Sequence, residues 1–421
     1  MYERSKLWQH AFRAQEDGYD SCRQRLRLAY ASFRQKIANL IESIPAHIPG
    51  LTVHDLTHLD ALWQMADILT DGDYNLNPCE AFVLGGAILL HDSAMTVAAY
   101  PNGLAEITAT PEYSDAITTI TAAHQRTGSS NQQETEGLIA RLAVSEVLRL
   151  KHASKAEDLA TQAWNSVLGE GQSFLIDDVP LREHYGFIIG RIAHSHHWDA
   201  NHLPQELGAT LGALSGFPVD WTIDPVKVAI ILRCADAMHI DDRRAPTFLA
   251  AIRAIEGSSL EHWRFQNKLG LPHVDNGNLV YTSKSPFTIE YANAWNLCYD
   301  TAQMIDRELK NANEMHKQRE LPTFLATGVA GANSPEAFSS YVQVSGWQPL
   351  PLNFRVSDVP RLARTLGGRD LYSNQLAPLR ELIQNAADAI EVRSIVDADF
   401  NVSDGVIKIR FEENRENIRP R

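Results

Sequence analysis

Histidine and aspartate residues recur at spacings that could bring several metal ligands together. His54 and His58 are four residues apart, so a helix would place both on one face. His91 and Asp92 directly follow an apolar run over residues 81–90 and can supply one nitrogen ligand and one bridging oxygen ligand. Imidazole and carboxylate ligands together suit Mn, Fe, Ni, Co or Zn, and also Mg where carboxylate and water dominate.

Further candidate ligands lie later in the chain. His152 occurs in RLKHASKAEDL, and Asp236 occurs in LRCADAMHIDD. Between them, the stretch IAHSHHWD contains His194, His196 and His197. A single histidine on a helix is more often packed or exposed than a ligand. The ordered set, which ends with an aspartate on an apolar helix, indicates a metal site instead.

This ordered pattern resembles the HD superfamily of phosphohydrolases over about residues 50–245. The stretch TVHDLTHLDAL is similar to the first motif of the cyclic-nucleotide phosphodiesterase branch. The resemblance implies that His54 acts as a general acid or as an extra ligand, and that Asp92 bridges two metals. It implies four core ligands, which are His58, His91, Asp92 and Asp236.

Two-metal members of the superfamily carry further histidines between the His-Asp pair and the last aspartate. For the second metal the resemblance implies His152 with His196 or His197, and it leaves His124 and His194 as alternatives. In such a site divalent metals activate water for attack on a phosphoester. A protonated His54 would then donate to the leaving oxygen.

Arginines near the last aspartate are candidates for phosphate binding. Arg233, Arg243 and Arg244 flank Asp236, and guanidinium groups suit phosphate oxygens. The alternative, a solvated helix end, is equally compatible with their positions.

A second motif, LYSNQLAPLRELIQNAADAIEVR, covers residues 371–393. On a helix, Glu381, Asn385 and Asp388 would share one face. The motif resembles the first ATP-binding helix of the Hsp90 group of GHKL ATPases. The resemblance implies that Glu381 orients the attacking water and Asn385 binds Mg, with Asp388 beside them in the ATP site. It also implies that homo-oligomers form through this part.

The later GHKL motifs that read adenine and cover the phosphates do not follow in the sequence. We therefore expect ATP and its Mg to bind only in a longer protein. The pairing of HD and Hsp90-like parts also resembles bacterial proteins of anti-phage defence. An alternative to hydrolysis is a sensory HD module that regulates the Hsp90-like ATPase.

Mainly helical elements must position these residues. The sequence predicts a small β insertion at 278–292, a strand at 405–414 and an irregular stretch at 96–135. Helices are predicted over about 4–44, 52–69, 79–92, 134–170, 182–197, 224–239, 291–319, 357–366 and 376–394.

The expected fold is mainly α, a helical HD bundle followed by an incomplete α/β GHKL fragment. We expect an HD domain with N-terminal helices over residues 1–320 and a truncated Hsp90-like domain over 357–421. Residues 321–356, rich in Gly, Ala, Pro and Ser at their start, are predicted to be a linker or an irregular connection.

Composition limits the classes of function. The 421 residues are 44% hydrophobic and 21% charged, which is typical of a globular protein. The net charge of −14 disfavours a broad nucleic-acid-coating surface and favours a small nucleotide among phosphoester substrates. Four separated cysteines form no disulfide framework, and no apolar run is long enough for a membrane span. We therefore expect a cytoplasmic protein.

Overall fold

The computed structural model describes most of the chain, and it divides the chain into two units. The described residues are 2–70, 74–127, 132–165, 169, 171–253, 255, 258–350, 377–397 and 400–409. The first unit is Met1–Pro351 and the second is Leu352–Arg421. No helix among the described residues is long and apolar enough to cross a membrane.

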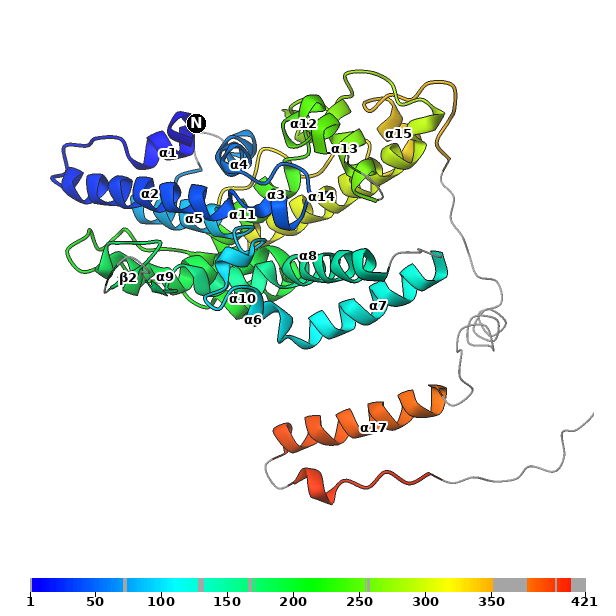
Figure 1. Ribbon diagram of the computed structural model, residues 1–421. Helices are drawn as coiled ribbons and strands as arrows, with labels where there is room; N and C mark the ends of the chain where they lie inside the picture. Colours follow the sequence, from blue (N-terminus) through cyan, green and yellow to red (C-terminus); the bar gives the residue numbers. More distant parts are fainter. Residues whose placement is uncertain are drawn as a thin grey trace, which may run out of the picture. The chain divides into compact units, whose positions relative to one another are not determined.

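The first unit is mainly helical, as predicted (Figure 1). Two short antiparallel hairpins accompany the helices, β1 (Trp164–Asn165) with β2 (Gln172–Ser173) and β3 (His273–Asp275) with β4 (Asn278–Val280). The longer helices are α2 (Asp20–Ile41), α4 (Leu56–Leu69), α5 (Pro78–Leu90), α7 (Pro111–Thr127), α8 (Gln132–Leu159), α9 (Val179–His194), α11 (Pro225–Met238), α13 (Ser258–Lys268) and α14 (Ala292–Gln318). The shorter α helices are α1 (Lys6–Ala11), α3 (Ile44–His47), α6 (Leu104–Thr108), α10 (Leu203–Leu207), α12 (Thr247–Arg253) and α15 (Pro335–Ser339).

Helix α5 is the buried centre of this unit. All 13 of its residues are buried, which explains why the run is apolar on every side. Its first turn is fixed by a capping box, in which Asn77 and Glu80 satisfy each other's backbone N–H groups. Helices α2, α9 and α11 pack against it. The residues that follow its last turn, His91 and Asp92, are consequently held inside the protein.

Helices α4 and α11 bring further site residues to the end of α5. The Asp55 side chain accepts a hydrogen bond from the Thr57 N–H and begins α4 directly after His54. The Asp224 side chain caps α11 in the same way. Because α11 packs against α4, α5 and α9, residues far apart in the sequence meet at one place.

Helices α8 and α9 approach each other closely at Gly190. A Cβ atom there would lie 2.0 Å from the carbonyl oxygen of Glu157. We expect Gly190→Ala to separate the helices and lower the free energy of unfolding by about 1–3 kcal/mol. Gly137→Ala is the matched control, because its Cβ meets nothing within 4 Å; alanine should stabilise α8 there by up to about 1 kcal/mol. Urea unfolding of both variants measures the difference, and equal effects would contradict the close approach.

One predicted irregular stretch is helical. Residues 96–135 contain α6 and the 17-residue α7, so the irregular assignment is wrong there. Pro111, taken as a breaker, is the first residue of α7. Proline is tolerated at this position because its missing N–H would have had no partner within the helix.

The predicted linker begins with an irregular connection that belongs to the first unit. Phe324 and Val342 are buried in the core of this unit. The Leu325 N–H donates to the Leu69 carbonyl at 2.8 Å, and the Leu279 N–H donates to the Gly328 carbonyl at 2.8 Å. Of the two alternatives, residues 321–350 therefore match the irregular connection. Residues 351–356 lie outside the described part.

The β insertion is smaller than predicted. Only Asn278–Val280 of the stretch 278–292 forms a strand, paired with His273–Asp275. Phe287 contributes an isolated bridge to Val344. The alternating residues here are fixed by contacts with α13, α14 and the irregular connection rather than by a larger sheet.

The described residues of the second unit comprise α17 (Ala377–Val396) and a short 3-10 helix, η7 (Val402–Asp404). Helix α17 confirms the helix predicted at 376–394. Residues 405–409 form no strand, and neither the rest of that prediction nor the helix at 357–366 falls on described residues. An α/β GHKL fragment is thus not evident in the described part of this unit.

Candidate metal centre

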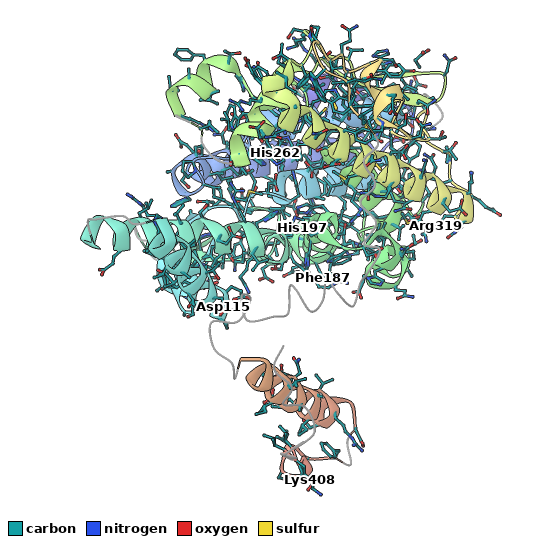
Figure 2. All side chains as sticks on the ribbon, turned by 90° about the vertical axis from the view of Figure 1, so that its right-hand side faces the viewer. Asp115, Phe187, His197, His262, Arg319 and Lys408 are labelled. Carbon is teal, nitrogen blue, oxygen red and sulfur yellow. The ribbon has the colours of Figure 1, made fainter. Side chains whose placement is uncertain are left out.

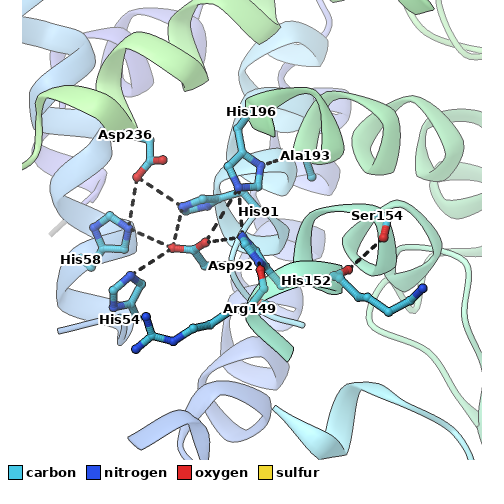
Figure 3. Close-up of polar contacts among 12 residues, drawn as sticks. His54, His58, His91, Asp92, Arg149, His152, Ser154, Ala193, His196 and Asp236 are labelled. Atoms are coloured by element: carbon cyan, nitrogen blue, oxygen red, sulfur yellow. Dashed lines mark hydrogen bonds and ion pairs between the residues drawn. The ribbon is translucent and has the colours of Figure 1, made fainter. Parts of the chain in front are cut away.

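Four predicted ligands meet at the end of α5, in what we call the first site (Figure 3). Asp92 Oδ2 lies 3.2 Å from His91 Nε2 and 3.8 Å from His58 Nε2. Asp236 Oδ1 lies 3.5 Å from His91 Nε2 and 3.6 Å from His58 Nε2. The ligand atoms of all four residues lie within 4.8 Å of one another. No single helix could bring these four residues together, because they come from α4, from the end of α5 and from α11.

Three histidines form a second site on the other side of Asp92. The ligand atoms of His152, His196 and His197 lie within 4.8 Å of one another. Asp92 Oδ1 lies 3.4 Å from His152 Nε2 and 3.9 Å from His196 Nε2. Helix α8 provides His152, and the 3-10 helix η3 (Ser195–His197) provides the other two. The two oxygens of one carboxylate therefore face two different groups of histidines.

The histidine tautomers direct ligand atoms inward. His91, His152 and His196 each donate from Nδ1–H to a main-chain carbonyl, so Nε2 is the ring nitrogen that each presents to a metal. The acceptors lie three residues earlier, on Ile88, Arg149 and Ala193, at 2.8, 2.7 and 2.6 Å.

The first site has an unsatisfied buried atom that suits a metal. His91 Nε2 is buried and has no contact with hydrogen-bond geometry, although carboxylate oxygens of Asp92 and Asp236 lie 3.2 and 3.5 Å from it. Such an atom is costly unless a ligand completes it. Together with the imidazole and carboxylate donors of both sites, this atom fits one or two divalent ions of the kinds named above.

Burial and charge set the protonation of the site. Burial opposes ionisation of Asp92, but the neighbouring histidines, His91 first, hold its pKa well below the usual range. Burial likewise opposes ionisation of Asp236, but His91 lowers its pKa to about 2. Burial lowers the pKa of His196 to about 3. For His91 burial is outweighed by Asp92 and Asp236, which raise its pKa well above the usual value. Both carboxylates are thus ionised, and the site attracts positive charge.

His54 lies beside the first site but is not protonated in this arrangement. Its Nε2 lies 3.6 Å from Asp92 Oδ2 and accepts a hydrogen bond from Arg244 Nη2 at 2.8 Å. Its Nδ1–H donates to the Thr52 carbonyl at 2.6 Å. Burial, and then the charge of Arg244, lower its pKa to about 3. The general-acid role stays a prediction. It requires a change in the surroundings of His54 that raises its pKa and allows the ring to be protonated.

His239 is a site residue that the sequence analysis missed. Its Nδ1 lies 2.8 Å from His58 Nδ1, and the two rings are nearly parallel at 7°. Its Nε2 is buried without a hydrogen-bond partner and lies 3.8 Å from Asp241 Oδ1. The spacing could have identified it, because His239 follows Asp236 by three residues and therefore lies on the same face at the end of the helix.

Only one of the three candidate arginines reaches the first site. Arg233 pairs with Glu308 at 2.5 Å and donates to the Trp198 carbonyl, so it supports the turn after α9. Arg243 pairs with Asp241 at 2.6 Å. Arg244 contacts His54 and His58 instead.

Other candidates lie outside both sites. Among the described residues, the clusters include neither His124 nor His194, and His194 Nδ1 bonds Glu157 Oε2 at 2.5 Å. In the second unit Asn385 and Asp388 are exposed on α17, and the Glu381 side chain is outside the described part. Their ATP-site roles stay predictions.

A helical unit with one buried carboxylate between two groups of histidines belongs to the class of His/Asp metal-binding domains. The HD-CE family model matches residues 48–311, more than half of the chain, and the chain belongs to this family of HD domains. No curated protein and no solved structure matches the chain. The match confirms the HD resemblance and does not extend to the Hsp90-like motif.

Proposed function

We propose that this chain is a metal-dependent phosphohydrolase that acts on nucleotides or nucleic-acid phosphodiesters. The observation that carries the proposal is the Asp92 carboxylate, whose two oxygens face His91 and His152 at 3.2 and 3.4 Å. When bound there, divalent metal supplies Lewis acidity, which polarises a phosphoryl oxygen and lowers the pKa of water.

The residues of the chain provide the remaining requirements. Asp92 and Asp236 stay ionised and hold positive charge in a buried place. Anchoring of the imidazoles to main-chain carbonyls keeps their Nε2 atoms in position without further ordering. His54 Nε2 lies beside Asp92 and accepts a hydrogen bond from Arg244, so a reacting group could use this lone pair only after Arg244 moves away.

The net charge of −14 supports a small substrate. A long duplex would approach an acidic protein against electrostatic repulsion, whereas a nucleotide needs only a local cationic site.

A chelation and reloading experiment tests the function. The purified chain is stripped with a chelator, reloaded separately with Mn, Co, Ni, Zn or Mg, and given nucleotides, cyclic nucleotides and oligonucleotides. We expect stripping to abolish hydrolysis of at least one substrate class and reloading to restore it, as measured by product chromatography. A fully loaded chain that cleaves none of these substrates would overturn the proposal.

One observation favours a second candidate, a regulatory HD module. Arg244 Nη1 lies 2.9 Å from His58 Nε2, so the guanidinium group covers a nitrogen that a metal would need. A chain that folds fully but takes up little metal in the same experiment would support this candidate. Its partner would be the Hsp90-like ATPase, whose assignment, like a role in anti-phage defence, rests on the motif at 371–393 alone.

A further inference from the structure

Arg244 is a buried cation that forms no ion pair with a carboxylate in the described part of the chain; burial lowers its pKa, and the more distant charges of Asp236 and Asp92 oppose that shift. Its exposed fraction is 8%, and its Nε is buried with no hydrogen-bond partner. Its other nitrogens contact only imidazole rings, with Nη2 2.8 Å from His54 Nε2 and Nη1 2.6 Å from His58 Nδ1. A buried charge is costly unless it is paired and hydrogen-bonded, so this arrangement lacks an anion.

The neighbouring arginines show what a completed pairing looks like in this protein. Arg243 lies 2.6 Å from the Asp241 carboxylate, and Arg233 lies 2.5 Å from the Glu308 carboxylate. Arg244 is as deeply buried as Arg233 but contacts the histidines of the first site instead of a carboxylate. Its missing partner is therefore expected to come from outside the chain, at the first site.

The position of Arg244 suits a phosphate group. The two imidazoles that it contacts present their Nε2 atoms to Asp92 Oδ2, at 3.6 Å for His54 and 3.8 Å for His58. A phosphate held at the first site would thus lie within reach of the guanidinium group. The planar fork of an arginine binds two phosphate oxygens at once, which a lysine ammonium does not do.

Further positive charge lies on the same side of the site. Arg149 and Arg244 contribute positive charge here, and after burial their charges are the causes that lower the pKa of His262. Figure 3 shows the Arg149 side chain extending toward His54. His262, on α13, is exposed, and Figure 2 shows it on the face that also carries His197. An anionic substrate would therefore pass positively charged side chains on its way to the first site, although the protein as a whole is acidic.

We propose that Arg244 is a catalytic residue that binds the phosphoryl group undergoing hydrolysis, exchanging its contacts with His54 and His58 for two phosphate oxygens. This inference rests on the proposed function. It assigns to Arg244 the stabilisation of phosphate charge at the first site. When substrate binds, Arg244 would leave His58, so the ring nitrogens of His58 would no longer contact the guanidinium group.

The test compares Arg244→Gln and Arg244→Lys with Arg264→Gln as the matched control. Arg264 lies on α13, pairs with Glu261 at 2.7 Å and belongs to neither metal-binding cluster. Affinity for inorganic phosphate is measured by calorimetry on the Mn-loaded chain, and metal content is measured by mass spectrometry. We expect Arg244→Gln to keep its metal and to bind phosphate about ten- to a hundredfold more weakly, the size of a lost charged hydrogen bond. Arg244→Lys should fall between it and the control.

Two results would overturn the inference. One is unchanged phosphate affinity in Arg244→Gln, and the other is loss of metal from both variants with phosphate binding lost in proportion. If Arg244→Gln does not fold, Arg244→Lys decides, because it keeps the charge and loses only the fork. Since phosphate binding requires no turnover, a chain that binds phosphate through Arg244 but hydrolyses nothing would contradict the proposed function alone.

Discussion

Asp92→Asn is expected to remove both metal sites at once and to lower hydrolysis about a thousandfold. The carboxylate is shared, with Oδ2 toward His91 and Oδ1 toward His152, so no other residue substitutes for it. The amide keeps the shape but removes the negative charge. If metal binding contributes about 4 kcal/mol of transition-state stabilisation, its loss corresponds to about three powers of ten in rate.

The comparison variant is Asp115→Asn, which removes an exposed carboxylate on α7, outside both clusters. Bound metal per chain and the rate of hydrolysis are measured for both variants. Asp115→Asn should match the parent in both measurements. If Asp92→Asn retains the full metal content of the parent, Asp92 is not a shared ligand and the central argument for the function fails.

The helices of the site could be predicted because the pattern of apolar residues in each helix depends on how deeply the helix is buried. The apolar run before His91 has no polar face, and this predicts a fully buried helix, as α5 proves to be. The spacing of His54 and His58 predicts a shared helix face, but α4 begins only at Leu56, so His54 lies before the helix; its ring nevertheless lies 5.6 Å from the ring of His58. Periodicity is a local property, and local properties can be read from one sequence.

Tertiary partners could not be predicted in the same way. His152 reaches Asp92 only because α8 packs against α9, and Gly190 allows that approach, yet neither fact is visible in local spacing. The three arginine candidates looked alike in sequence, and only packing shows that Arg244 alone contacts the first site. The Arg233 pairing depends on Glu308, which is 75 residues away in the sequence, whereas Arg243 pairs with Asp241 only two residues away.

The tautomer of His58 depends on a competition between two neighbours. If His58 Nδ1 donates to His239 Nδ1, 2.8 Å away, its Nε2 is free to bind a metal. Arg244 Nη1 lies 2.6 Å from the same Nδ1 and can only donate. Donation by Arg244 would leave the proton on Nε2 and close that nitrogen to a metal. His239 Nε2 lies 3.8 Å from the Asp241 carboxylate; a proton on this nitrogen leaves Nδ1 to accept from His58, which favours the metal-binding tautomer.

Replacing His239 should therefore weaken the first site and spare the second. We expect His239→Leu to lower metal affinity at the first site about ten- to a hundredfold, the usual effect of losing a partner of a metal-binding histidine. His239→Asn, whose amide oxygen can still accept from His58, should restore part of that affinity. Competition with a chromophoric chelator measures the affinity for Co at the first site and at the second site. The second site, built on His152 and His196, is the control within the same molecule. Equal losses at both sites would indicate general damage to the fold, and no loss at either would show that His239 does not select the tautomer.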